Sequence, residues 1–133
     1  MKYIGEFKNN KIEGKGLWIW PNGDKYEGDF VNGKFEGYGI EVKIDGKRYE
    51  GQFKEDEYDG KGVRYYPNGE KYEGEFQSSN FHGKGIFTYS DGTILEGSWN
   101  NGKKDGIFKK TTNQGILKYI EYKGNVQIKE FDN

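Results

Sequence analysis

The sequence predicts an all-β protein, a single-layer antiparallel meander of about five 23-residue β-hairpin repeats with one further hairpin at its C-terminal end. Three observations predict this fold class. The 133 residues include 22 Gly, 11 Tyr, 9 Phe and 3 Trp, and glycine disfavours helices whereas aromatic residues favour pleated sheets. Glycines recur every 23 residues. Each repeat also contains two turn motifs, which divide it into two strands.

The repeat is visible in "PNGDKYEGDF", which returns almost unchanged as "PNGEKYEGEF". When each repeat is numbered from its first in-phase glycine, positions 1, 10, 12 and 19 hold Gly almost throughout. Position 1 is occupied by Gly5, Gly28, Gly51, Gly74 and Gly97. Such a period marks a repeat architecture. We therefore expect one domain over residues 1–133, with repeats at 5–27, 28–50, 51–73, 74–96 and 97–119.

Two turns of different length are expected in each repeat. "NGK" at 32–34 and 101–103 is typical of a two-residue type I′ hairpin. "PNG" at 21–23 and 67–69 predicts a three-residue loop, because Pro suits its first position and Gly its left-handed last position. Equivalent residues of successive repeats must face the same side of the sheet. One even and one odd loop satisfy this requirement and explain the odd period.

Aromatic residues follow the same phase as the glycines. Position 3 holds Phe7, Phe30, Phe53, Phe76 and Trp99. Position 22 holds Tyr26, Tyr49 and Tyr72, and Tyr3 precedes the first repeat. The loop lengths predict that position 1 Gly lies beside position 12 Gly on both neighbouring strands, and that position 3 Phe lies beside position 10 Gly on both. One face then carries a Tyr row, a bare glycine row and a Phe row, and rings folded over the glycines form a thin core.

The opposite face is expected to carry ladders of charge. Lysines at position 11 (Lys15, Lys61, Lys84) lie across from acids such as Glu6 and Glu75 in this register. Aliphatic residues at position 13 flank glutamates in the same way. Opposite charges on neighbouring strands stabilise a sheet modestly, by about 0.2–1 kcal/mol per pair.

The two ends of the sheet depart from the pattern. In the fifth repeat Phe108 stands where the other repeats have Gly, and Lys118 stands where they have Tyr. Residues 116–131 predict one more hairpin, with Gly-Asn in its turn, that caps the array. We expect the first strand to be an edge strand, with which another chain could pair.

The segments "YEGDFVNGKFEGYGI" and "YEGEF…FHGKGIFTYSDGT" resemble the membrane occupation and recognition nexus (MORN) repeat. The resemblance extends from residue 3 to about residue 119. It implies a partner-binding scaffold in a cytoskeletal, ciliary or other multiprotein assembly. The alternative that it implies is a membrane-surface module that associates with phospholipid.

The sequence offers little for catalysis. It contains no Cys and a single His, His82, so no Ser-His-Asp or Cys-His set and no His-Cys metal site can be assembled. The Gly-x-Gly pairs lack the strand-to-helix context of a phosphate loop. We therefore predict a non-enzymatic protein with no catalytic residue, no metal and no cofactor, and we interpret His82 as an incidental surface residue.

A protein partner, either an amphipathic helix or an extended peptide, is expected on the aromatic face. The alternative for the in-phase rings is that they only pack against one another. Trp and Tyr are frequent interface anchors, and those that the repeat does not require are the better candidates. The candidate partner-binding residues are Trp18, Trp20, Tyr26, Tyr49, Tyr66, Tyr72, Phe87 and Tyr89.

Charge and hydropathy bound the remaining partners. The formal net charge is −1 and like charges do not cluster, which argues against nucleic acid and predicts only weak attraction to anionic lipid. The sequence has neither a signal peptide pattern nor an apolar stretch of membrane-spanning length. The expected location is cytoplasmic, associated with the cytoskeleton or a cilium, with peripheral membrane attachment as the alternative.

Overall fold

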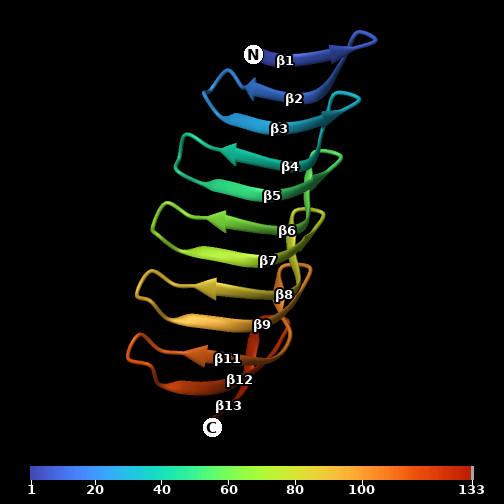
Figure 1. Cartoon of the computed structure of the whole chain (residues 1–133). Coiled ribbons are helices and arrows are strands. Elements are labelled where there is room, and N and C mark those ends of the chain that lie inside the picture. The colour runs from blue at the N-terminus through green and yellow to red at the C-terminus, as the bar shows by residue number, and fades with distance from the viewer. Residues whose placement is uncertain (133) are drawn as a thin grey trace.

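The computed structural model describes residues 1–132 and has the predicted all-β fold, with 13 strands in one antiparallel sheet (Figure 1). Twelve strands neighbour each other in chain order, and the short β10 pairs with β9 beside this path. The strands are β1 (Lys2–Lys8), β2 (Lys11–Ile19), β3 (Lys25–Val31), β4 (Lys34–Val42), β5 (Arg48–Lys54), β6 (Glu57–Tyr65), β7 (Lys71–Gln77), β8 (Asn80–Thr88), β9 (Ile94–Asn100), β10 (Lys103–Lys104), β11 (Gly106–Thr111), β12 (Leu117–Lys123) and β13 (Val126–Asp132).

Both predicted turn types are confirmed. At the two-residue turn between β3 and β4, Asn32 and Gly33 have φ of 52° and 79°, as a type I′ turn requires. At the three-residue loop between β2 and β3, the Gly23 amide donates to the Trp20 carbonyl over 2.9 Å. The side chain of Asn22 accepts the amide of Asp24, which is an Asx turn. Local sequence is therefore sufficient to reverse the chain at both ends of each hairpin.

The predicted register is confirmed across the three-residue loops and wrong near the two-residue turns. Gly28 pairs with Gly16 on one side and Gly39 on the other, as expected. Phe30, however, pairs with a position 10 glycine only on the β2 side and with Phe35 on β4. A bulge causes this difference, because one residue of β3 faces three of β4. Gly37 lies in the bulge with φ of 73°, a conformation that favours glycine.

From the second hairpin onward, each two-residue turn is hydrogen-bonded to the repeat before it. The amide of Asp56 donates to the carbonyl of Phe35 over 3.0 Å, and the Asp56 carboxylate accepts the amide of Phe35 over 2.7 Å. The amide of Glu55 donates to the carboxylate of Glu36 over 3.0 Å. Turns that stack in this way hold adjacent hairpins together beyond the sheet ladder, which makes the sheet one continuous ribbon (Figure 1).

The core is a thin layer of rings on one face, and the predicted Tyr row covers the predicted glycine row. A Cβ added at Gly62 would lie 2.6 Å from ring atoms of Tyr49. The Tyr49 hydroxyl also donates to the carbonyl of Gln52 over 2.7 Å, which satisfies an acceptor at the bulge. Equivalent bonds are made by Tyr3, Tyr26 and Tyr72. A ring over glycine thus supplies both packing and a backbone partner.

A further aromatic row at position 8 completes this core, and sequence analysis missed it. Its rings stack on the Tyr row at centroid separations of 3.8–3.9 Å. The stacked pairs are Tyr26 with Phe35, Tyr49 with Tyr58, and Tyr72 with Phe81. The bulge brings this row onto the aromatic face beside the position 3 phenylalanines, which is why the unbulged register did not place it there.

Two departures from the pattern, Leu95 at the end of the fourth repeat and Phe108 in the fifth, compensate for each other. Leu95 occupies a Tyr position and is 2% exposed, and Phe108 occupies a Gly position and is fully buried. The Phe108 ring lies over Gly97, where an added Cβ would meet it at 2.6 Å. A ring from the neighbouring strand therefore fills the space that the shorter leucine leaves. Beyond it, β12 and β13 form the last hairpin of the sheet.

Candidate partner-binding surfaces

The Tyr row does not offer a binding surface, which corrects part of the sequence prediction. Tyr26, Tyr49 and Tyr72 are 0%, 1% and 0% exposed. Each makes edge contacts at 5.0–5.2 Å with phenylalanines or tryptophan of the next two repeats. These rings are buried in the core. A partner that binds to this face therefore cannot contact them without disrupting the core.

The five other candidate aromatics are partly exposed and fall into two groups. Trp18 and Trp20 lie in the first repeat, where Trp20 packs edge-on against Phe35 at 5.7 Å. Tyr66, Phe87 and Tyr89 lie further along the same face and contact one another, with centroid separations of 6.0 and 4.8 Å. We refer to these as the Trp pair and the Tyr66 group. The structure therefore does not unite the predicted residues into one cluster.

A polar contact occupies the face between the two groups. The Tyr58 hydroxyl donates to the carboxylate of Glu41, and the guanidinium of Arg64 lies over the rings of Tyr58 and Tyr66 at 5.9 and 5.3 Å. Glu41 and Arg64 stand at the repeat position that holds Trp18 and Phe87 in other repeats. Since charged residues serve the sheet equally well there, the aromatic residues at these positions are not demanded by the fold.

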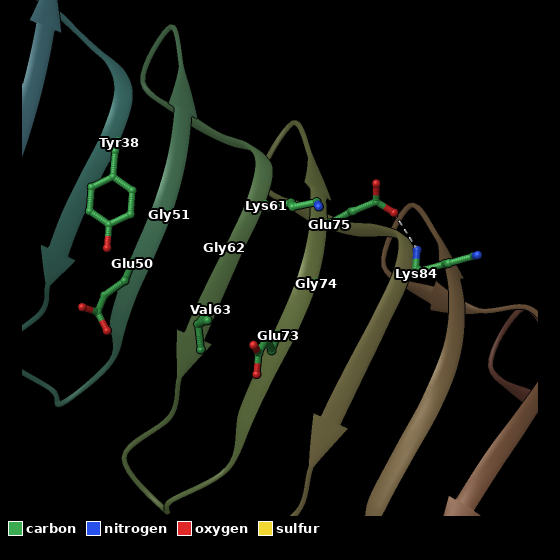
Figure 2. Close-up of a pocket in the computed structure, with 10 residues that line it drawn as sticks. All are labelled: Tyr38, Glu50, Gly51, Lys61, Gly62, Val63, Glu73, Gly74, Glu75 and Lys84. Carbon is green, nitrogen blue, oxygen red and sulfur yellow. Dashed lines mark hydrogen bonds between the residues drawn. The ribbon is translucent and has the colours of Figure 1, made fainter.

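The opposite face contains a groove that sequence analysis did not identify. Strand alternation turns side chains next to the glycines away from the aromatic layer, and Figure 2 shows them in two rows on either side of the glycine line. One hollow has a volume of about 580 Å³ and a second of about 440 Å³. The residues of the first are Tyr38, Glu50, Gly51, Lys61, Gly62, Val63, Glu73, Gly74, Glu75 and Lys84.

The charges of this groove are not paired as predicted. Lys15 does pair with Asp29 across the strands at 2.6 Å, but Lys61 and Lys84 form no ion pair within residues 1–132. The carboxylate of Glu75 instead accepts the backbone amide of Lys84 over 3.0 Å. The bulge leaves that amide without a ladder partner, so the acidic side chain is used by the backbone. The ammonium groups stay free in the groove.

His82 has a structural role that the sequence interpretation missed. Its Nδ1 accepts the amide of Asn101 over 3.2 Å. Glu36 and Asp59, at the same position of earlier repeats, accept the corresponding turn amide. His82 is thus one member of a row of hydrogen-bond acceptors that hold successive turns together. The 23-residue spacing of His82 from Asp59 and Glu36 could have revealed this role.

The buried tyrosines predict a loss of stability in alkaline solution. Burial raises the pKa of Tyr26, Tyr49 and Tyr72 above the usual tyrosine value near 10. The unfolded chain loses these protons first, so their stabilisation is complete below about pH 10 and declines above it. The free energy of unfolding should then fall by up to about 1.4 kcal/mol per pH unit for each tyrosine.

Urea denaturation at pH 8, 10 and 11, with phenolate absorbance recorded in parallel, measures this loss. Tyr49→Phe should lose less stability than the unmodified protein over the same range, because one titrating group is gone. Phenolate formation by all tyrosines near pH 10 without unfolding would contradict the prediction.

Comparison with known proteins identifies a family that this chain matches. A family model described as the MORN repeat matches residues 3–25, 26–48, 49–71, 72–94 and 96–107. The first four matches each span 23 residues, the period of the glycines. No curated protein matches the chain. Within residues 1–132, no helix is long and apolar enough to cross a membrane.

Proposed function

Because this chain belongs to the MORN repeat family, whose repeats are generally non-enzymatic modules for protein and membrane interaction, we propose that it is a protein–protein interaction scaffold. It binds a segment of a partner and holds it within a multiprotein assembly. The resemblance suggests a cytoskeletal or ciliary assembly in the cytoplasm. The ribbon supports such a role because its stacked turns present side chains at a regular spacing.

One observation carries this proposal: large aromatic side chains remain partly exposed where the fold does not require them. Trp18 and Phe87 occupy a repeat position that holds Glu41 and Arg64 in other repeats. Trp20, Tyr66 and Tyr89 occupy one that holds Lys43 in the second repeat. A fully packed core explains the Tyr row, but it does not explain these rings. Partly exposed Trp and Tyr are the residues that most often anchor a protein interface.

Affinity purification of the tagged protein from cells of its source organism, followed by mass spectrometry, tests the proposal. Trp18→Ala with Trp20→Ala, and separately Phe87→Ala with Tyr89→Ala, should reduce recovery of the specific partner at least tenfold. Ile44→Ala is the control, because this apolar side chain is 68% exposed on a loop and should leave recovery unchanged. Circular dichroism establishes that each variant is folded. Undiminished recovery by both folded aromatic variants would overturn the proposal.

A membrane-surface role is the second candidate, and the free ammonium groups of Lys61 and Lys84 favour it. Anionic lipid attracts unpaired lysines, but the glutamates across the groove oppose this attraction. Flotation with phosphatidylserine vesicles at physiological salt separates the two roles. We expect little binding, and strong binding that Lys61→Glu with Lys84→Glu removes would favour the membrane role.

A further inference from the structure

We infer that the groove opposite the aromatic layer receives an α-helix of a partner protein, lying across the strands and having a seven-residue repeat. Acidic side chains on one flank of this helix face Lys61 and Lys84, and basic side chains on its other flank face Glu73 and Glu96. The inference deepens the scaffold function proposed above, and it names a different surface from the Trp pair and the Tyr66 group.

The groove is continuous over several repeats. Its two hollows share Glu73 and Lys84, and together they extend from Tyr38 to Ser98. Figure 2 shows the first hollow, where Lys61, Glu75 and Lys84 lie on one side of the glycine line. Val63 and Glu73 lie on the other side. A ligand lying along the glycine line therefore meets the same two walls in each repeat.

The two walls differ in charge, and no ion pair within the described residues neutralises the difference. One wall carries the exposed Lys61 and Lys84 with Glu75 between them, and the carboxylate of Glu75 is bound to the backbone amide of Lys84. The other wall carries the exposed Glu73 and Glu96. None of these residues forms an ion pair within residues 1–132. A ligand that is acidic on one flank and basic on the other complements both walls, whereas a ligand of uniform charge is repelled by one of them.

The spacing of the walls matches a helix. Adjacent strands lie about 4.8 Å apart, so two strands advance the groove by about 9.6 Å per repeat. Seven residues of an α-helix rise about 10.5 Å. One heptad of a partner helix therefore advances by about one repeat. Residues seven apart on the helix therefore face equivalent lysines and glutamates of successive repeats. In a coiled coil, residues seven apart face the partner helix in the same way.

The floor of the groove favours a helix over an extended peptide. The floor is glycine backbone, and Gly62 pairs with Gly51 and Gly74 in the sheet ladder. An extended peptide buried there would leave its own amides and carbonyls without partners, which is costly. A helix satisfies these groups internally. Its apolar side chains can contact the half-buried Val63 and Ile86 beside the floor.

The test uses a synthetic, fluorescein-labelled peptide of three heptads with an apolar seam, glutamates along one flank and lysines along the other. A control peptide has the same composition with one residue inserted after each heptad, so that its charges wind around the helix. In fluorescence anisotropy titrations of the full chain, the first peptide should bind at least tenfold more tightly than the control. Equal affinities, or binding of neither peptide, would overturn the inference.

Charge reversal locates the site. Lys61→Glu with Lys84→Glu should weaken binding of the first peptide at least tenfold, and a peptide with lysines on both flanks should bind this variant more tightly than the first peptide does. Lys34→Glu with Lys103→Glu changes the charge equally outside the groove and should have less than a twofold effect. Equal effects of the two reversals would overturn the site.

The outcome is independent of the scaffold function itself. Trp18→Ala with Trp20→Ala should leave peptide affinity unchanged, because these rings lie on the other face. Suppose that the aromatic variants lose native partners, that Lys61→Glu with Lys84→Glu retains them, and that the peptide does not bind. The scaffold function is then supported and the helix-binding groove is overturned. If the peptide binds in the groove but no specific native partner is recovered, the groove is supported and the scaffold function is overturned.

Discussion

Gly51→Ala is expected to destabilise the protein by about 3 kcal/mol, the upper end of the usual cost of overpacking. The backbone at Gly51 is not in the left-handed region, so an L-residue is conformationally acceptable there. The added Cβ would, however, meet the Cα of Gly62 and lie 2.6 Å from the carbonyl oxygen of Lys61. Both are backbone atoms of the adjacent strand, and they cannot rotate away. Relief requires the two strands to separate.

Gly69→Ala is the matched control, because it makes the same chemical change at a glycine with a strained backbone conformation and no close neighbours. No atom lies within 4 Å of an added Cβ at Gly69, but φ is +90°. Its cost is backbone strain alone, of about 1 kcal/mol. Urea denaturation of both variants measures the difference. If Gly69→Ala costs as much as Gly51→Ala, close strand contact is not the reason for the glycine row.

Tyr49→Ala should cost about 3–5 kcal/mol in the free energy of unfolding, the range for removing a large ring from a core. The ring is 1% exposed and stacks on Tyr58 at 3.9 Å. It also contacts Phe53 and Phe76 edge-on at 5.1 Å. Tyr49→Phe keeps the packing and removes only the hydroxyl bond to Gln52, so it should cost about 1 kcal/mol.

A double variant tests whether this ring is what requires glycine on the neighbouring strand. A Cβ at Gly62 would collide with Tyr49 ring atoms, so Gly62→Ala alone should be destabilising by about 1–3 kcal/mol. In the Tyr49→Ala background the same change should cost almost nothing, because the obstructing ring is gone. Additive costs in equilibrium denaturation would show that the ring and the glycine are not coupled.

Local signals in the sequence were sufficient for the strands, their direction and both turn types. Asn32-Gly33 and Pro21-Asn22-Gly23 each specify a turn through their own backbone preferences, without help from distant residues. The strict period places every copy of a position on the same face, which is why the Tyr row over glycine was predictable from residues such as Tyr49 and Gly62.

Part of the candidate site could not be predicted in this way. The partly exposed aromatics Trp18 and Phe87 were identified because they break the repeat. Whether Tyr49 is available to a partner depends on Tyr58 and Phe76, which reach it only after folding. The groove was missed because the register alone places Lys61 opposite Glu75, which suggested that the two charges neutralise each other.

The sequence by itself determined a 23-residue period, two turns in each repeat and one aromatic face, because each follows from conformational preferences within a few residues. Only the tertiary structure decided the bulge near each two-residue turn, since a bulge is a property of two paired strands and not of either one. The bulge brings Tyr58 onto Tyr49 and leaves the amide of Lys84 free of the sheet ladder. That amide donates a hydrogen bond to the carboxylate of Glu75. The bulge therefore decides which rings are buried and which charges remain free to bind a partner.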